Sequence, residues 1–233
     1  MAAAALQSVQ VLLFDTFGTT VDWRGSLIAD LQRFGREHSV EADWAALADA
    51  WRAKYKPAIQ SVNEGRRPWA NFDALHRETL DEILPQFGLS GLNNVQRDEM
   101  VRGWEHLRGW PDAVSGIRRL KARFVVGPLS NGNVRQLTNM AKSAGLPWDL
   151  ILGADIFHRY KPESEIYRGA VALLNCPADA VMMVAAHNND LQAARSCGMK
   201  TAFVQRSTED SEPQSGWDLV TTNFENLADQ LAA

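Results

Sequence analysis

Residues 9–19 of the chain read VQVLLFDTFGT, and this stretch decides the fold. Its first half is a nearly continuous apolar run, which is typical of a β-strand buried on both faces. The run ends abruptly at Asp15, and a glycine follows three residues later. Ligands of open parallel α/β sheets bind beyond the carboxyl ends of the strands, so this position predicts a chemical role for Asp15. Because aspartate also commonly caps turns and helices, the strand alone leaves a purely structural role open.

The composition is that of an ordinary globular protein. The chain has 233 residues, 45% hydrophobic and 22% charged, which fits one large domain or one domain carrying a smaller one. With a formal net charge of -4 and no basic stripe, nucleic acid is not an expected partner, and no polybasic or amphipathic anchor indicates a membrane surface. An anionic substrate would have to be attracted by a few locally placed cations.

The sequence favours a cytoplasmic location. Residues 1–8 lack the basic and apolar regions of a signal peptide, and no apolar run approaches the length of a membrane span. Cys176 and Cys197 lie 21 residues apart without a metal-ligand spacing, so we expect two reduced, mostly buried thiols.

A helical pattern occupies the chain from about Trp23 to about Arg108. Apolar residues recur there at helical spacing, and five of the eight tryptophans fall in this segment. An aromatic stripe at this spacing is more typical of a helix-bundle core than of a ligand cage. We therefore expect a helical cap domain at 23–108, inserted into a core domain formed by 1–22 and 109–233.

From Trp110 onward, short apolar segments alternate with helical ones. This alternation predicts βαβ units and a parallel sheet with right-handed crossovers. The fold class is therefore α/β, a Rossmann-like parallel sheet with a helical cap after its first strand. The polar segment Ser207–Gly216 is expected to be a surface loop. The expected strands are 124–129, 150–153, 181–186 and 201–205, and the expected helices are 112–122, 133–144, 163–174, 189–197 and 223–232.

Polar residues follow several of these strands. The first strand ends at Asp15, the second ends in Ser130-Asn131, the loop after the third carries Lys161, and the fourth is followed by Asp190. Because parallel strands end at one edge of a sheet, we expect a carboxylate, a hydroxyl, an ammonium group and a second carboxylate to converge there.

These motifs, in this order, resemble those of the haloacid dehalogenase superfamily, and within it the L-2-haloacid dehalogenases of type II. The first motif of the superfamily is Asp-x-x-Gly-Thr, here Asp15 to Thr19. The second is a strand ending in Ser or Thr, here Ser130, the third is Lys161-Pro162, and the fourth is an acidic strand end, here Asp190. The resemblance covers nearly the whole chain.

Most of the superfamily are Mg²⁺-dependent phosphatases, and this chain departs from them at two places. Their general-acid aspartate, two residues after the nucleophile, is replaced by Phe17, which cannot exchange a proton. Their metal-binding aspartate pair at the fourth motif is reduced to Asp190. We therefore expect neither a metal nor another cofactor.

Two further matches lie in the helical insertion. The family has a catalytic arginine after a tryptophan, here Trp51-Arg52, and a pocket-lining aromatic in an Asn-Phe pair, here Asn71-Phe72. From the residues alone, a solvated helix face is open for Arg52, although its register within the insertion favours the site, and a place in the cap core is equally open for Phe72.

The resemblance implies hydrolytic removal of halide from a short 2-haloacid. Asp15 would attack the α-carbon and form an ester, a case of nucleophilic catalysis by a carboxylate that Lys161 keeps ionised. Arg52 and Asn131 would stabilise the leaving halide. Water would then attack the ester carbonyl with Asp190 as general base or water-orienting residue. A single inversion turns an (S)-haloacid into an (R)-hydroxy acid.

Other site residues follow from the same resemblance. The Ser130 hydroxyl and the backbone N–H groups of Thr16 and Phe17 would bind the substrate carboxylate. Thr19, which ends the first motif, and Tyr167, which follows Lys161-Pro162 in the family pattern, are assigned to the catalytic set. Asn188 and Phe72 are assigned to substrate binding.

The fourth motif also departs from the dehalogenase pattern. Ala185 and His187 replace the usual Ser and Asn, so the side of the site that handles water is altered. His187 is either a strand-end residue packed on the core or a new polar group near the ester.

Two other functions compete with the dehalogenase. One is a phosphatase of the same fold, and the other is a non-catalytic protein that binds a small molecule. The expected partner is a small anionic haloacid. The family is often dimeric, and the tryptophan-rich insertion offers surface for a homodimer.

Overall fold

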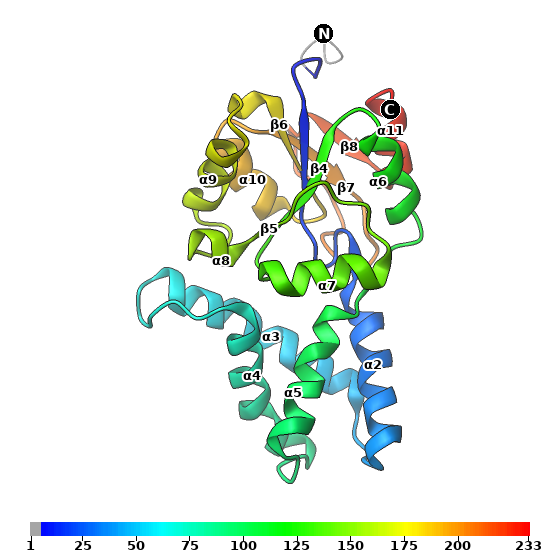
Figure 1. The fold of residues 1–233 in the computed structure, drawn as a ribbon, viewed down its shortest axis with the longest axis vertical. Helices are drawn as coiled ribbons and strands as arrows, with labels where there is room; N and C mark the ends of the chain where they lie inside the picture. The colour runs from blue at the N-terminus through cyan, green and yellow to red at the C-terminus, as the bar shows by residue number, and fades with distance from the viewer. Residues whose placement is uncertain (1–5) are drawn as a thin grey trace.

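The computed structural model describes residues 6–233 and has two stacked halves, a sheet half and a helical half (Figure 1). Residues 1–5, on which much of the signal-peptide argument rests, lie outside the described residues. Among the described residues, no helix combines the length and apolarity needed to cross a membrane.

Within residues 6–233, six parallel strands form the sheet in the order β5-β4-β1-β6-β7-β8. The predicted α/β architecture is confirmed, and the bounds of the expected strands differ from the prediction by at most two residues. β1 lies in the middle of the sheet, so its carboxyl end is flanked by strands on both sides. The strands are β1 (Val11–Phe14), β4 (Val125–Ser130), β5 (Leu152–Gly153), β6 (Val181–Ala185), β7 (Lys200–Val204) and β8 (Leu219–Thr221).

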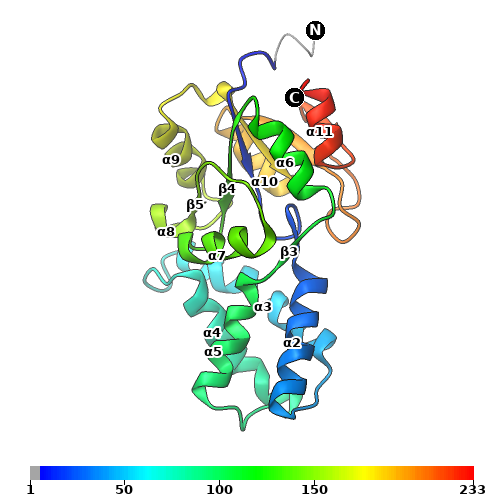
Figure 2. The same ribbon diagram turned by 45° about the vertical axis from the view of Figure 1, so that its right-hand side comes forward.

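The apolar run of β1 is explained by helices on both faces of the sheet. Leu12 and Phe14 point into the core beneath α6 (Ala113–Lys121) and α11 (Phe224–Gln230). These two helices lie side by side over that face (Figure 2). The alternate residues Val11 and Leu13 point into a second core. That core is covered by α9 (Ser164–Leu174) and α10 (Asn188–Ser196).

The helical half consists of α2 to α5. Each helix begins at an Asp or Asn whose side chain accepts a hydrogen bond from a backbone N–H in the first turn. The four are α2 (Trp23–His38), α3 (Trp44–Asn63), α4 (Phe72–Ile83) and α5 (Asn94–Arg102), with short 3₁₀ turns at Leu84–Phe87 and Gly103–Glu105.

A two-stranded antiparallel ribbon connects the halves. β2 (Val21–Asp22) pairs with β3 (Arg108–Gly109), so the chain leaves the sheet half and returns to it at one place. We propose this ribbon as the boundary between a core domain of 1–22 and 109–233 and a cap domain of 23–108.

Several short elements were not predicted from the sequence. These are β2, β3, the edge strand β8 and α8 (Ala154–Phe157), all of four residues or fewer. Elements this short carry too few residues to show a hydrophobic period. The expected surface loop at Ser207–Gly216 is confirmed, since most of its residues are exposed, but the side chain of Glu209 in this loop reaches the sheet edge and is 9% exposed.

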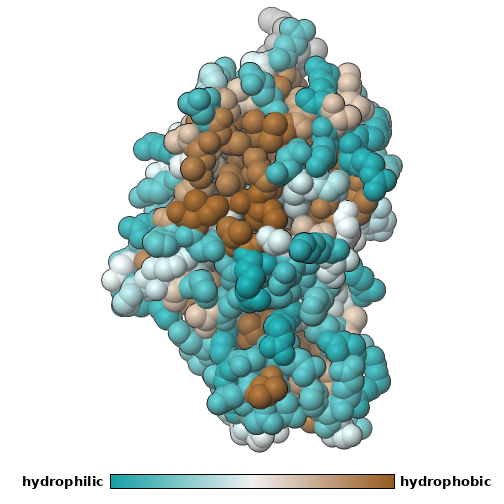
Figure 3. Space-filling view, viewed as in Figure 1, coloured by the Kyte–Doolittle hydropathy of each residue, from teal (hydrophilic) through white to brown (hydrophobic). Residues whose placement is uncertain are grey.

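The two halves differ in surface character. Apolar surface gathers on the sheet half around β4 and β5, whereas the helical half presents mainly hydrophilic residues (Figure 3). Val125, Ile156 and Leu173 are among the exposed apolar side chains of the sheet half.

Candidate functional site

A cavity of about 890 Å³ opens at the carboxyl ends of the strands, where the two halves meet. Its wall combines side chains of the sheet half and of α2 and α3. From the sheet half come Asp15, Phe17, Asn131, Lys161, Tyr167, His187, Asp190 and Glu209, and from the helices Trp23, Arg52, Tyr55, Ile59 and Asn63. Asp15, Asn131, Lys161 and Asp190, which follow four different strands, do converge here, whereas Ser130 lies behind the wall.

Asp15 follows β1 directly and is 7% exposed. Its Oδ2 accepts hydrogen bonds from Thr19 Oγ1 at 2.7 Å and from His187 Nδ1 at 2.9 Å. Thr19 is held in turn by the Ala186 N–H, and Gly18 takes a left-handed backbone conformation with φ of 87°. The turn thereby fixes the orientation of the carboxylate.

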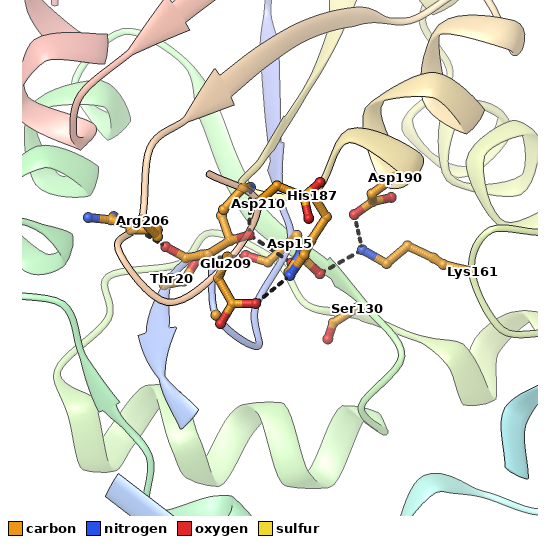
Figure 4. A network of polar contacts seen from close by, with 12 residues as sticks. Asp15, Thr20, Ser130, Lys161, His187, Asp190, Arg206, Glu209 and Asp210 are labelled. Carbon is orange, nitrogen blue, oxygen red and sulfur yellow. Dashed lines mark hydrogen bonds and ion pairs between the residues drawn. The ribbon is translucent and has the colours of Figure 1, made fainter. Parts of the chain in front are cut away.

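Lys161 lies between two carboxylates. Its Nζ donates to Asp15 Oδ1 at 2.8 Å and to Asp190 Oδ2 at 2.5 Å (Figure 4). Burial lowers the pKa of Lys161, but the charges of Asp15 and Asp190 outweigh burial and raise it above its ordinary value. The ammonium is therefore charged at neutral pH.

The two carboxylates are shifted in opposite directions. Burial raises the pKa of Asp15, but the charge of Lys161 and the hydrogen bond from His187 hold it well below its usual range. For Asp190, burial and the charge of Asp15 outweigh Lys161 and raise the pKa. Tyr167 donates to Asp190 Oδ1 at 2.5 Å. Asp15 is thus fixed as the anion, and Asp190 is the better proton acceptor.

His187 bridges Asp15 to a residue that sequence reasoning missed. Its Nε2 lies 2.8 Å from Glu209 Oε2, on the opposite side of the ring from Asp15 (Figure 4). Burial lowers the pKa of His187, but the hydrogen bonds to Asp15 and Glu209 raise it to about 10. The ring is therefore an imidazolium that donates from both nitrogens. The sequence left open whether His187 packs on the core or lies among the polar groups near Asp15, and the structure shows the second arrangement.

Glu209 could have been predicted by the same rule as the other site residues, namely that polar residues following parallel strands meet at one edge of the sheet. The segment Thr208-Glu209-Asp210 follows β7, a parallel strand whose carboxyl end lies at the same edge as that of β1.

Arg52 is brought to the cavity by α3. Its guanidinium lies 4.4 Å from the centre of the Tyr55 ring and 5.1 Å from that of Trp23. Within the described residues, its Nη1 is buried without a hydrogen-bond partner. A buried cationic donor with no protein partner is suited to an anionic ligand. The sequence left open whether Arg52 lies on a solvated helix face or in the site, and the structure places it on the cavity wall.

Asn131 links the sheet half to the helical half. Its Nδ2 donates to Tyr55 Oη at 2.5 Å, and its Oδ1 accepts from the Lys161 N–H at 2.7 Å. Tyr55 lies three residues after Arg52 on the same helix and was not predicted as a site residue.

Two of the predicted substrate-binding side chains, those of Ser130 and Phe72, lie behind the cavity wall. Ser130 is 1% exposed and its Oγ accepts from the Gly132 N–H. Phe72 is 1% exposed and packs on Phe17, with ring centres 5.4 Å apart, which matches the core alternative. Thr16 is buried, but within residues 6–233 neither its N–H nor that of Phe17 has a protein hydrogen-bond partner. These two N–H groups are therefore available for an anion.

Asn188 does not line the cavity. Its side chain donates to Asp210 and to the Glu212 carbonyl, and accepts from the Gln214 N–H and Trp217 Nε1. This side chain is used to hold the loop after β7, so its position does not support the expected contact with substrate.

The site does not fit the Mg²⁺ used by the superfamily's phosphatases. The carboxylates of Asp15 and Asp190 both contact the Lys161 ammonium, so two of their four oxygens are already engaged by a cation. Phe17 fills the general-acid position and packs on aromatic rings. Among the described residues, no cluster of three or more His, Cys, Asp or Glu is arranged to hold a metal ion.

Comparison with known proteins assigns the family. A model of the haloacid dehalogenase-like hydrolases matches residues 9–198. The crystal structure of a defluorinating L-2-haloacid dehalogenase is 41% identical, with a TM-score of 0.93 over 97% of this chain and 96% of that one. An (S)-2-haloacid dehalogenase of Pseudomonas sp. strain CBS-3 is 25% identical over 89% of each chain. The pyrophosphatase PpaX of Bacillus velezensis is 24% identical over 90% of this chain and 89% of its own length. The chain therefore belongs to the haloacid dehalogenase-like hydrolases, in the branch of the L-2-haloacid dehalogenases.

Proposed function

We propose that this protein hydrolyses short (S)-2-haloacids to (R)-2-hydroxy acids through an ester on Asp15. The observation that carries the proposal is a buried, ionised carboxylate facing a cavity whose wall also holds the guanidinium of Arg52, with an Nη1 that has no hydrogen-bond partner among residues 6–233. An anionic substrate with an electrophilic carbon fits between the two groups.

The contacts of Asp15 support Oδ1 as the attacking atom. Oδ2 already accepts two hydrogen bonds, from Thr19 and His187, so both of its lone pairs are engaged. Oδ1 accepts one, from Lys161, and keeps a lone pair for the α-carbon. The carbon–oxygen bond forms as the carbon–halogen bond breaks, and the bonding electron pair leaves with the halide.

Two groups of donors suit the two ends of the substrate. The N–H groups of Thr16 and Phe17, which have no protein hydrogen-bond partner within residues 6–233, suit the substrate carboxylate. Arg52 and the second amide proton of Asn131 suit the departing halide, because both lie on the cavity wall. Positive potential at the point where charge develops lowers the barrier to displacement.

Ester hydrolysis needs a proton acceptor and a proton donor. Water attacks the Asp15 carbonyl carbon and loses a proton to Asp190, whose pKa is raised. The bond to Oδ1 then breaks, and Lys161, which contacts Oδ1, protonates the departing oxygen. Asp190 returns a proton to Lys161 across their contact, and the new Asp15 carboxyl releases the proton that accompanies the halide. The α-carbon inverts once, during displacement.

The test is halide release from fluoro-, chloro- and bromoacetate and from both enantiomers of 2-chloropropionate. We expect turnover of the (S) enantiomer alone, with (R)-lactate as product and no loss of rate after dialysis against EDTA. A phosphatase would instead hydrolyse a generic phosphate ester and lose activity with EDTA. Halide release that EDTA abolishes and Mg²⁺ restores would contradict the proposed chemistry.

Isotope labelling tests the ester directly. In a single turnover in H₂¹⁸O with enzyme in excess, solvent oxygen should enter the Asp15 carboxyl and not the hydroxy acid. Label in the product of that first turnover would mean that water attacks the substrate directly. The Asp15→Asn variant, expected to fold and to release no halide at first mixing, is the matched control.

A further inference from the structure

Glu209 has two hydrogen bonds to the site. Its Oε2 accepts from His187 Nε2 at 2.8 Å, and its Oε1 accepts from Trp23 Nε1 at 3.0 Å. Its side chain is 9% exposed. A carboxylate withdrawn from water to this degree needs charged or hydrogen-bonding partners, and the imidazolium is the cation that contacts it.

Two neighbouring segments, the turn at Gly18 and the loop held by Asn188, fix the position of the Glu209 carboxylate. A Cβ at Gly18 would lie 2.3 Å from the Glu209 carboxyl carbon, so the glycine of the first motif leaves the space that Glu209 fills. Asn188 anchors the same loop through Asp210, Glu212, Gln214 and Trp217. Both features hold Glu209 in one position.

We propose, on the basis of the proposed function, that Glu209 is a positioning residue: it holds the His187 imidazolium against Asp15 Oδ2 while the ester is hydrolysed. If Oδ1 attacks the substrate, Oδ2 becomes the carbonyl oxygen of the ester and then the oxyanion of the tetrahedral intermediate. Thr19 at 2.7 Å and His187 at 2.9 Å are at the distances expected of donors to an oxyanion.

The role of Glu209 follows from a change of charge during the reaction. In the free enzyme, among the described residues, two carboxylates contact the His187 ring, those of Asp15 and Glu209. Ester formation removes the charge of Asp15. Glu209 is then the remaining carboxylate in contact with the ring, and it keeps the imidazolium protonated when the oxyanion forms.

Four other charged groups near the ring line the same cavity as His187. Lys161 and Asp190 lie beyond Asp15, and Arg52 faces the same cavity from α3. Asp210 accepts from the Asn188 N–H at the start of α10. Among the described residues, none of these four has a hydrogen bond or ion pair with the His187 ring, so Glu209 is the group whose loss should change its protonation in the ester.

The test compares Glu209→Gln with Glu212→Gln. Both changes remove one negative charge from the same loop, but the Glu212 side chain is exposed and away from the cavity. We expect Glu209→Gln to lower kcat by roughly 10- to 100-fold at pH 8 and to let the Asp15 ester accumulate, visible in the intact mass. Because the reactive form is the imidazolium, the alkaline fall of kcat should move to lower pH by at least one unit. Glu212→Gln should behave as wild type.

Two further measurements separate this role from a merely structural one. In a His187→Ala background, Glu209→Gln should have almost no additional effect on ester hydrolysis. The ¹⁵N shifts of the His187 ring, followed against pH in the resting enzyme, should show protonation lost at lower pH in Glu209→Gln than in wild type. This titration needs no substrate.

The outcomes distinguish the two proposals. If wild type releases no halide from any 2-haloacid, the proposed function fails. If wild type turns over but Glu209→Gln has an unchanged pH profile and no adduct, the role of Glu209 is wrong. Should Glu209→Gln fail to fold, a wild-type His187 ring that titrates near its ordinary pKa would itself overturn the proposal.

Discussion

At the scale of single residues, the two oxygens of Asp15 have different surroundings. Oδ2 is bound by Thr19 and His187, and Oδ1 by Lys161. This asymmetry gives the two oxygens different roles in the proposed reaction, one as nucleophile and the other as the later oxyanion. The pKa of Asp15, held low, keeps the nucleophile ionised at neutral pH.

His187→Ala is predicted to slow ester hydrolysis more than displacement. The change removes a donor to Oδ2 but leaves Lys161, Arg52 and the attacking oxygen in place. Halide should appear in a burst of about one equivalent per site, followed by a slow phase, while a covalent adduct accumulates on Asp15. Rapid-quench halide assays and intact mass measure both. A variant with neither burst nor adduct would place His187 in the displacement step or in the fold alone.

At the scale of elements, the loop between β7 and β8 is organised by one side chain. Asn188, at the start of α10, makes four side-chain hydrogen bonds to residues 210–217. The loop therefore carries Glu209 to the site without regular secondary structure of its own. Its stability depends on contacts with α10 rather than on local propensity.

Asn188→Ala is predicted to destabilise this loop and, through Glu209, to slow catalysis. Loss of the four bonds should lower the free energy of unfolding by about 2–4 kcal/mol in urea titrations. kcat should fall with little change in KM, because Asn188 lies outside the cavity wall. Ser211→Ala, at an exposed position of the same loop, is the control. If Asn188→Ala instead had normal stability and a raised KM, Asn188 would be a substrate-binding residue.

At the scale of the whole molecule, the cavity is complete only because the helical half lies over the sheet edge. Asn131 donates to Tyr55, and Asn63 exchanges two hydrogen bonds with the Tyr160 backbone. These contacts join α3 to the sheet half and place Arg52 on the wall of the cavity that Asp15 also lines. Because Asp15 is 7% exposed in this cavity, its contact with water during displacement is limited, which favours attack by the carboxylate.

Arg52 is predicted to be needed although it is distant from Asp15 in sequence. Arg52→Lys keeps the charge but loses the planar fork and its stacking on Tyr55, so kcat should fall about 10-fold or more. In Arg52→Ala, kcat should fall further, by about 100-fold or more. Lys54→Ala on the same helix removes an exposed cation paired with Glu82 and should leave halide release unchanged. Near-normal kinetics in both Arg52 variants would remove Arg52 from the site.

The sequence by itself determined the parallel sheet and most of the polar residues that gather at its carboxyl edge. The apolar run of β1 and the strand–helix alternation predicted the parallel fold, because burial on both faces requires apolar residues at consecutive positions. The convergence of Asp15, Lys161 and Asp190 at the carboxyl edge of the sheet followed from topology, since parallel strands end at one edge and each residue follows a different strand. Arg52 was assigned through resemblance.

Only the tertiary structure decided which neighbours each of these residues has. Glu209 contacts His187 and Trp23, and Tyr55 contacts Asn131, across separations of 22, 186 and 76 residues. Asn188 was assigned to substrate binding, whereas its side chain binds the loop after β7, because a position after a strand does not say which way a side chain points. A local sequence pattern fixes the period of a helix or strand, but the contacts of a loop depend on how distant segments pack together. The carboxylate that holds His187 therefore became visible only when the loop after β7 was seen folded against the first motif.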